Sequence, residues 1–261
     1  MSSEESANAR EVLRRTVVVH VGARAMRFAW AIGVPQVVSS CVTFRRVTGE
    51  DGGVRADAVV GEPAGGDATS RTVWPLCRGG FNLGDHSQQQ VCEAMCHLLR
   101  HAVDTCLTGS DHCADVTLAL CMPDTWTRRE ILDVCDIALR RVDKVTRLLL
   151  LPVSTCAVVA HGRTSACVAH IGHSVTTVTC VHDLLPLPST RVALKHCTHT
   201  WLHALQSHLG LPDRVEPELA TALQRSLVLP PPPLLQAAAA QALKVRRYKQ
   251  IYGYLPRDDD F

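Results

Sequence analysis

The sequence predicts an α/β protein with a mainly parallel sheet flanked by helices. Between residues 87 and 160 helix and strand patterns alternate, which is typical of parallel sheets covered by helices. Two β-hairpin patterns, at residues 16–32 and 164–181, enclose this stretch. The 261 residues suffice for one domain or for two lobes that share a cleft.

The N-terminal part predicts a tail, a hairpin and an insertion. Residues 1–15 are polar and predict a tail or a frayed helix. Two β-branched runs, 16–21 and 25–32, predict the first hairpin, and residues 36–44 predict a third strand. The Gly-rich and charged segment 48–72 predicts a flexible insertion.

A helical period begins near residue 87, with Asp85 or Ser87 as the N-cap. The elements expected after it are a strand at 116–120, a helix from Thr127, a strand at 145–150 and a short helix at 152–160. In the helix from Thr127, we expect four apolar side chains to face inward: Ile131, Val134, Ile137 and Leu139.

The second hairpin repeats a feature of the first. His20-Val-Gly22 and His170-Ile-Gly172 each place a histidine, a branched residue and a glycine at the turn of a strand pair. We interpret the pair as an internal duplication. After the second hairpin the sequence predicts helices at 195–209, 216–227 and 234–252, with the proline run 230–233 as a stiff spacer.

Composition excludes several classes of function. Lys+Arg 27 against Asp+Glu 25 gives a formal charge of only +2, so nucleic acid is not an expected partner. The apolar runs are too short to span a bilayer, so no membrane role is expected. Twelve cysteines occur without any CxxC, and the N-terminus lacks an apolar signal region. We therefore expect neither a zinc framework nor disulfides.

Five segments in order resemble the actin and actin-related protein family, within the sugar-kinase and heat-shock-70 ATPase superfamily. Val17-Val-Val-His-Val-Gly22 is similar to its first phosphate loop, Val-Val-Asp-Asn-Gly-Ser-Gly. The other four are Trp74-Pro-Leu-Cys-Arg-Gly-Gly-Phe-Asn-Leu83, residues 116–123 with Arg129-Glu130 after them, Ala160-His-Gly-Arg-Thr164 before a hairpin, and Leu184-Leu-Pro-Leu187. The resemblance implies an actin-like, ribonuclease H-like mixed sheet.

The departures from the family suggest that catalysis is lost. The degenerate nucleotide-binding loops would be His20, Val21, Gly22 and Ala23, and His170, Ile171, Gly172 and His173. Histidine replaces the family's Asp in both loops, and Val153 stands near the place of its catalytic Gln. Without carboxylates to hold hydrated Mg²⁺, hydrolysis loses its electrostatic support. We expect a pseudo-ATPase with no catalytic residue, metal or cofactor, and nucleotide binding is left open.

The three imidazoles of His20, His170 and His173 could instead bind a transition metal, but hydrogen-bonded cleft residues are the preferred interpretation. The resemblance also implies the lobes: an N-terminal tail at 1–15, a first lobe at 16–160, and a second lobe at 161–261 that is shortened and incomplete relative to the family.

A partner surface is predicted on the last helix. Apolar Leu235 with a rim of Arg246, Arg247, Tyr248 and Tyr252 has the composition of a protein interface. From the resemblance we expect a non-catalytic structural subunit of a cytoskeletal, ciliary or flagellar assembly in the cytoplasm. The alternatives are a subunit of a nuclear chromatin-remodelling complex, and a degenerate ATPase or small-molecule kinase.

Overall fold

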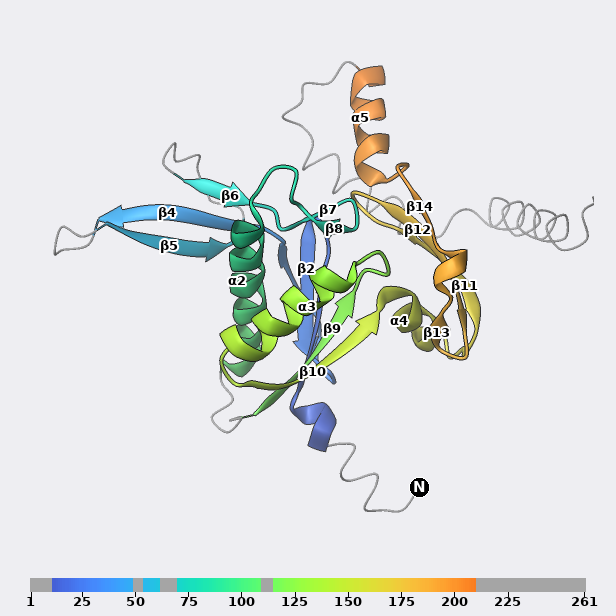
Figure 1. Ribbon diagram of the computed structural model, residues 1–261, viewed down its shortest axis with the longest axis horizontal. Coiled ribbons are helices and arrows are strands. Elements are labelled where there is room, and N and C mark those ends of the chain that lie inside the picture. Colours follow the sequence, from blue (N-terminus) through green and yellow to red (C-terminus); the bar gives the residue numbers. More distant parts are fainter. Residues whose placement is uncertain (1–10, 49–53, 62–69, 109–114, 210–261) are drawn as a thin grey trace, which may run out of the picture. The chain divides into compact units, whose positions relative to one another are not determined.

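The computed structural model describes residues 11–48, 54–61, 70–108 and 115–209 (Figure 1). The chain divides into two compact units, Met1–Trp201 and Leu202–Phe261. All strands of the described residues lie in the first unit. No helix in the described part of the chain is long and apolar enough to cross a membrane.

A five-stranded mixed sheet forms the centre of this unit, in the order β10-β9-β1-β2-β3. The strands β1 (Thr16–Val21), β9 (Val116–Met122) and β10 (Val145–Pro152) run parallel. The strands β2 (Ala25–Trp30) and β3 (Gln36–Ser39) add to β1 as antiparallel neighbours. The predicted fold class, a mixed sheet flanked by helices, is confirmed.

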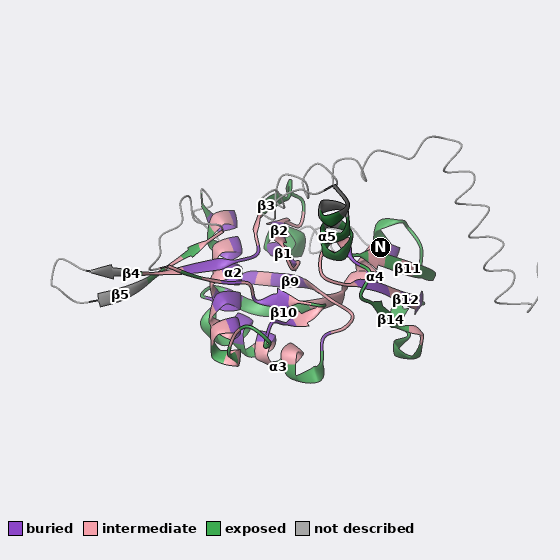
Figure 2. Cartoon of the chain, turned by 90° about the horizontal axis from the view of Figure 1, so that it is seen from above, coloured by how far each residue is buried: buried purple, intermediate pink, exposed green. Residues whose placement is uncertain are grey.

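Helix α2 (Gln88–Leu107) covers one face of the sheet (Figure 2). Ser87 is its N-cap, and a capping box with Gln90 satisfies two free N–H groups of the first turn. The helix shares one core with alternate β1 side chains; the fully buried members include Val17, Val19, Val21, Leu98 and Leu99. Burial of this apolar stripe drives the packing of helix on sheet.

The next helix departs from its prediction in the last turn. Helix α3 (Arg128–Asp136) begins at the N-cap Thr127, as expected, and continues as a π-helical turn, Ile137–Arg141. Ile137 is buried, but Leu139 is 47% exposed, so the expectation that Leu139 faces inward is wrong. A π turn has more residues than an α turn, so the inward face shifts along the sequence.

A second, three-stranded sheet corrects two expectations. The predicted strand 36–44 is broken at the buried Ser40 and Cys41, and its second half belongs to β4 (Val42–Thr48) of the other sheet. The segment 48–72, expected to be a flexible insertion, contains β5 (Val54–Val60), which pairs along β4. β6 (Arg71–Val73) pairs with the other edge of β4.

A third sheet begins after residue 160, where we expected the second lobe. It contains β11 (Ala166–Ile171), β12 (Thr176–His182), β13 (Leu185–Pro186) and β14 (Val192–Leu194). Helix α4 (Val153–Ala160) connects β10 to this sheet and packs on it. Helix α5 (Thr198–Leu209) follows β14. The lobe boundary at 160 stays a prediction, because residues 1–201 group as one compact unit.

A small hairpin, β7 (Leu76–Cys77) and β8 (Gly80–Phe81), is held to α3 by Glu130. The Glu130 carboxylate accepts hydrogen bonds from the Phe81 N–H at 2.6 Å and from the Thr127 N–H at 2.7 Å. One side chain therefore caps the helix and fixes the hairpin.

Glu130→Ala is expected to lower the free energy of unfolding by about 1–2 kcal/mol, because the cap is lost and the Phe81 N–H loses its acceptor. Urea denaturation measures the change. The control is Asp136→Ala, which removes only a surface ion pair with Arg140 and should cost less than about 0.5 kcal/mol. Equal losses in the two variants would contradict this role.

Candidate functional site

The two predicted phosphate loops have the same local geometry. In the first hairpin the Gly22 N–H donates to the Ala25 carbonyl at 3.0 Å, and in the second the Gly172 N–H donates to the Val175 carbonyl at 3.0 Å. A Cβ atom at Gly22 would lie 2.9 Å from the Ala25 oxygen, and one at Gly172 would lie 2.7 Å from the Val175 oxygen. Both turns thus require glycine for the same steric reason, which agrees with the predicted duplication.

Alanine at either turn is expected to lower the free energy of unfolding by about 1–2 kcal/mol, because the new methyl group collides with a backbone carbonyl. Gly22→Ala and Gly172→Ala would each be measured by urea denaturation. Gly84→Ala is the matched control, since no atom lies within 4 Å of its added Cβ. A loss at Gly84 as large as at Gly172 would show that the turns have no such constraint.

The structure brings His20 and His170 together. Their ring centroids are 6.4 Å apart, and the rings are nearly perpendicular at 83°. Each imidazole also lies beside the glycine of its own turn: a Cβ on Gly172 would be 3.5 Å from His170 Nε2, and one on Gly22 would be 3.9 Å from His20 Cε1. The two imidazoles therefore occupy the space next to the turn glycines.

Burial favours the neutral form of both imidazoles. Burial first, and then the nearby His170 and Arg27, lower the pKa of His20 to about 4. Burial also lowers the pKa of His170, to which Arg27 adds, while Asp124 acts in the opposite direction. The pair therefore supplies neither negative charge for a hydrated Mg²⁺ nor positive charge for a phosphate.

Not every predicted loop residue lies beside this histidine pair. Val21 is only 1% exposed and belongs to the core, so its backbone position but not its side chain is part of the turn. Ile171 is 71% exposed. Ala23 is half-buried, and the neighbouring Arg24 stacks over Trp74, with its guanidinium carbon 4.9 Å from the ring centroid.

The second turn is tied to the start of α5. The Thr198 N–H donates to the Gly172 carbonyl at 3.1 Å, and the His199 N–H donates to the His173 carbonyl at 2.9 Å. The rings of His173 and His199 pack edge to face, with centroids 5.6 Å apart. His173 thus faces the helix start, where its ring packs against that of His199.

The sequence patterns did not predict the carboxylate of Asp124 near the histidine pair. Asp124, in the loop after β9, lies close enough to raise the pKa of His170. Its two oxygens accept from the Ser154 hydroxyl at 2.6 Å and from the Ser154 N–H at 3.3 Å, at the start of α4. Val153, in the expected place of the catalytic Gln, is the first residue of that helix. In the sequence, Asp124 follows the carboxyl end of a parallel strand, and this position is the signal that could have identified it as a site residue.

The arrangement is a poor metal site. In the described ranges, no group of three or more His, Cys, Asp or Glu side chains could hold a metal ion. The nearby Asp124 carboxylate accepts two hydrogen bonds from Ser154. A transition-metal site at His20, His170 and His173 would need a third ligand near the first two imidazoles.

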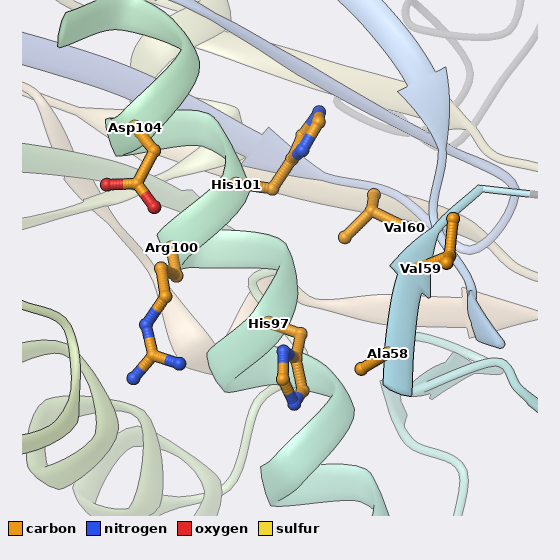
Figure 3. Close-up of a pocket in the computed structure, with 7 residues that line it drawn as sticks. All are labelled: Ala58, Val59, Val60, His97, Arg100, His101 and Asp104. Carbon is orange, nitrogen blue, oxygen red and sulfur yellow. The ribbon is translucent and has the colours of Figure 1, made fainter. Parts of the chain in front are cut away.

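A shallow pocket of about 330 Å³ lies elsewhere, between α2 and β5 (Figure 3). His97 and His101 stack edge to face on Phe44 and Phe28, while Arg100 and Asp104 point away from β5. Its polar groups do not converge on one point, so the histidine pair between the hairpins remains the candidate site. The predicted partner residues, Leu235, Arg246, Arg247, Tyr248 and Tyr252, lie outside the described residues.

No family model matches the sequence. Two curated relatives do: actin-related protein 8 of Danio rerio, 28% identical over 129 residues, and actin-related protein 9 of Arabidopsis thaliana, 31% identical over 126 residues. These matches cover 47% and 46% of this chain. The match spans only 20% of the length of each relative.

Solved structures with the same architecture include human actin-related protein Arp8 in its ATP-bound state, with a TM-score of 0.67 at 15% identity, covering 87% of this chain and 63% of that one. The MamK double helical filament has a TM-score of 0.55 at 15% identity, and the match covers 74% of this chain and 58% of that one. MreB5 of Spiroplasma citri bound to ADP has a TM-score of 0.56 at 13% identity, and the match covers 74% of this chain and 56% of that one. The resemblance inferred from the five sequence segments is confirmed.

Proposed function

We propose that this chain, which has an actin-like fold and is similar to actin-related proteins, is a non-catalytic subunit of a nuclear chromatin-remodelling complex and acts through contacts with protein partners. The non-catalytic part of this proposal rests on His20 and His170. These two side chains lie together where the family resemblance implies two aspartates.

Physical chemistry supports the loss of hydrolysis. Phosphoryl transfer needs charge to hold Mg²⁺ and a group to position the attacking water. Both loops carry a histidine whose neutral form is favoured by burial. The side chain of Val153 has no group that can form a hydrogen bond to a water. The carboxylate of Asp124, near His170, accepts a hydrogen bond from the Ser154 hydroxyl. These features favour a structural rather than a catalytic role for the two loops.

The nuclear assembly is preferred to the cytoskeletal or ciliary one. The curated relatives that match are actin-related proteins 8 and 9, and the solved structure with a TM-score of 0.67 is human Arp8. The formal charge of +2 gives no reason to place the chain directly on DNA, so the proposed contacts are with proteins.

The test is fractionation followed by native purification. A tagged chain is expected in the nuclear fraction, in a large complex whose other members are chromatin-remodelling subunits identified by mass spectrometry. The tag alone is the control. Recovery of the chain as a monomer, or with axonemal or cytoskeletal proteins from the cytoplasmic fraction, would contradict the proposal.

A further inference from the structure

Two cysteines that the proposed function does not use lie within contact of one another. The Sγ atoms of Cys121, on β9, and Cys156, on α4, are 3.7 Å apart. They come from different elements, separated by 35 positions in the sequence, so tertiary packing alone brings them together. Both are half-buried and both are free thiols.

We propose that Cys121 and Cys156 form a redox-active dithiol that a hydroperoxide converts into an intramolecular disulfide. The Sγ atoms, already 3.7 Å apart, must approach to about 2.05 Å to form the bond. The inference does not depend on the proposed function, because it uses only the β9–α4 contact.

The surroundings distinguish the two thiols. The contact between the two sulfurs is the first cause that lowers the pKa of Cys156. The same contact is the first cause that raises the pKa of Cys121. The position of Cys156 in the first turns of α4 also favours negative charge on its sulfur. Cys156 is therefore the attacking sulfur and Cys121 the resolving one.

The reaction balances with one equivalent of hydroperoxide. The Cys156 thiolate attacks the peroxide oxygen, the O–O bond breaks, and the leaving alkoxide or hydroxide takes a proton, giving an alcohol or water and a sulfenic acid on Cys156. The Cys121 sulfur then attacks the sulfenic sulfur, the S–O bond breaks, and the thiol proton leaves in water. Two thiols are oxidised, and the peroxide is reduced.

The link would act at the edge of the candidate site. Cys121 is the register partner of His20 on β1, and α4 packs against β9, β10, β11 and β12. A disulfide would fix α4 to β9, and with it the strands that carry His20 and His170. In a reducing compartment such disulfides are usually transient and sense redox state.

The test uses the purified, reduced full chain treated with hydrogen peroxide and then with an alkylating agent. We expect an intact-mass loss of about 2 Da relative to the reduced chain before alkylation. A linked peptide joining Cys121 to Cys156 should appear and disappear after dithiothreitol. Tandem mass spectrometry must assign the site, because Cys106 and Cys113 share the tryptic peptide of Cys121.

Matched variants identify the attacking sulfur. Cys156→Ser should abolish the link and the sulfenic acid, whereas Cys121→Ser should leave the sulfenic acid on Cys156 trapped by dimedone. Cys92→Ser is the control, since Cys92 is also half-buried but burial raises its pKa. No linked peptide in the wild-type chain, or an unchanged yield in Cys156→Ser, would overturn the proposal, and the wild-type measurement requires no variant to fold.

Discussion

Acidification from pH 7 to pH 4 is expected to lower the free energy of unfolding by about 3 kcal/mol through His20 alone. The pKa of His20 is about 4 in the folded chain, against the ordinary histidine value of 6.5. Above pH 6.5 both states hold a neutral imidazole, and the contribution is complete. As the pH falls below 6.5 the unfolded chain binds the proton first, so stability falls until the folded pKa near 4 is reached.

Urea denaturation at pH 7, 5 and 4 would measure this loss, and a matched variant separates it from the titration of carboxylates. His20→Asn retains a polar side chain that does not titrate, so its stability should fall by about 3 kcal/mol less than that of the wild type over the same interval. The His20 ring proton in NMR should report the same pKa. An identical pH dependence for both chains, or a His20 pKa near 6.5, would show that the imidazole is not buried as described.

Combined loss of Arg247 and Tyr252 is expected to weaken partner binding by about 2–4 kcal/mol, or roughly 30- to 1000-fold in Kd. Arg and Tyr anchors contribute most of the free energy at many interfaces, and both residues belong to the predicted helix 234–252. Titration of the partner onto the double alanine variant measures the change.

The control for this surface is Lys244→Ala on the same predicted helix, because lysine is depleted at interface centres and its loss should cost less than about 1 kcal/mol. If deletion of residues 234–261 left the association unchanged, the partner surface would lie elsewhere. The test then moves to the edge of β5, in the segment 48–72.

Local signals predicted those elements that local interactions determine. Of the two predicted caps of the first long helix, Asp85 and Ser87, the structure has Ser87, and the predicted start near Thr127 is confirmed. In both cases the cap pairs with an acidic or amide side chain three residues later. The two hairpins were predicted from β-branched runs that flank a glycine, and the carbonyl close to each glycine explains why that residue is needed. These features require no knowledge of the tertiary fold.

The errors arose where the backbone is irregular or where the decisive contact is distant in sequence. The break between β3 and β4 occurs at buried Ser40 and Cys41, without the Gly or Pro that would mark a turn. Leu139 was misplaced because the π turn breaks the 3.6-residue period. Asp124 was missed because only folding brings the loop after β9 to Ser154 and His170.

The proposed loss of nucleotide hydrolysis is tested most directly by Mg²⁺-dependent ATP turnover of the purified chain. We expect no turnover above background, and none in His20→Asp/His170→Asp either, because Val153 still provides no group to position water. Turnover that depends on Mg²⁺ and is lost in Asp124→Asn or His170→Ala would contradict the claim.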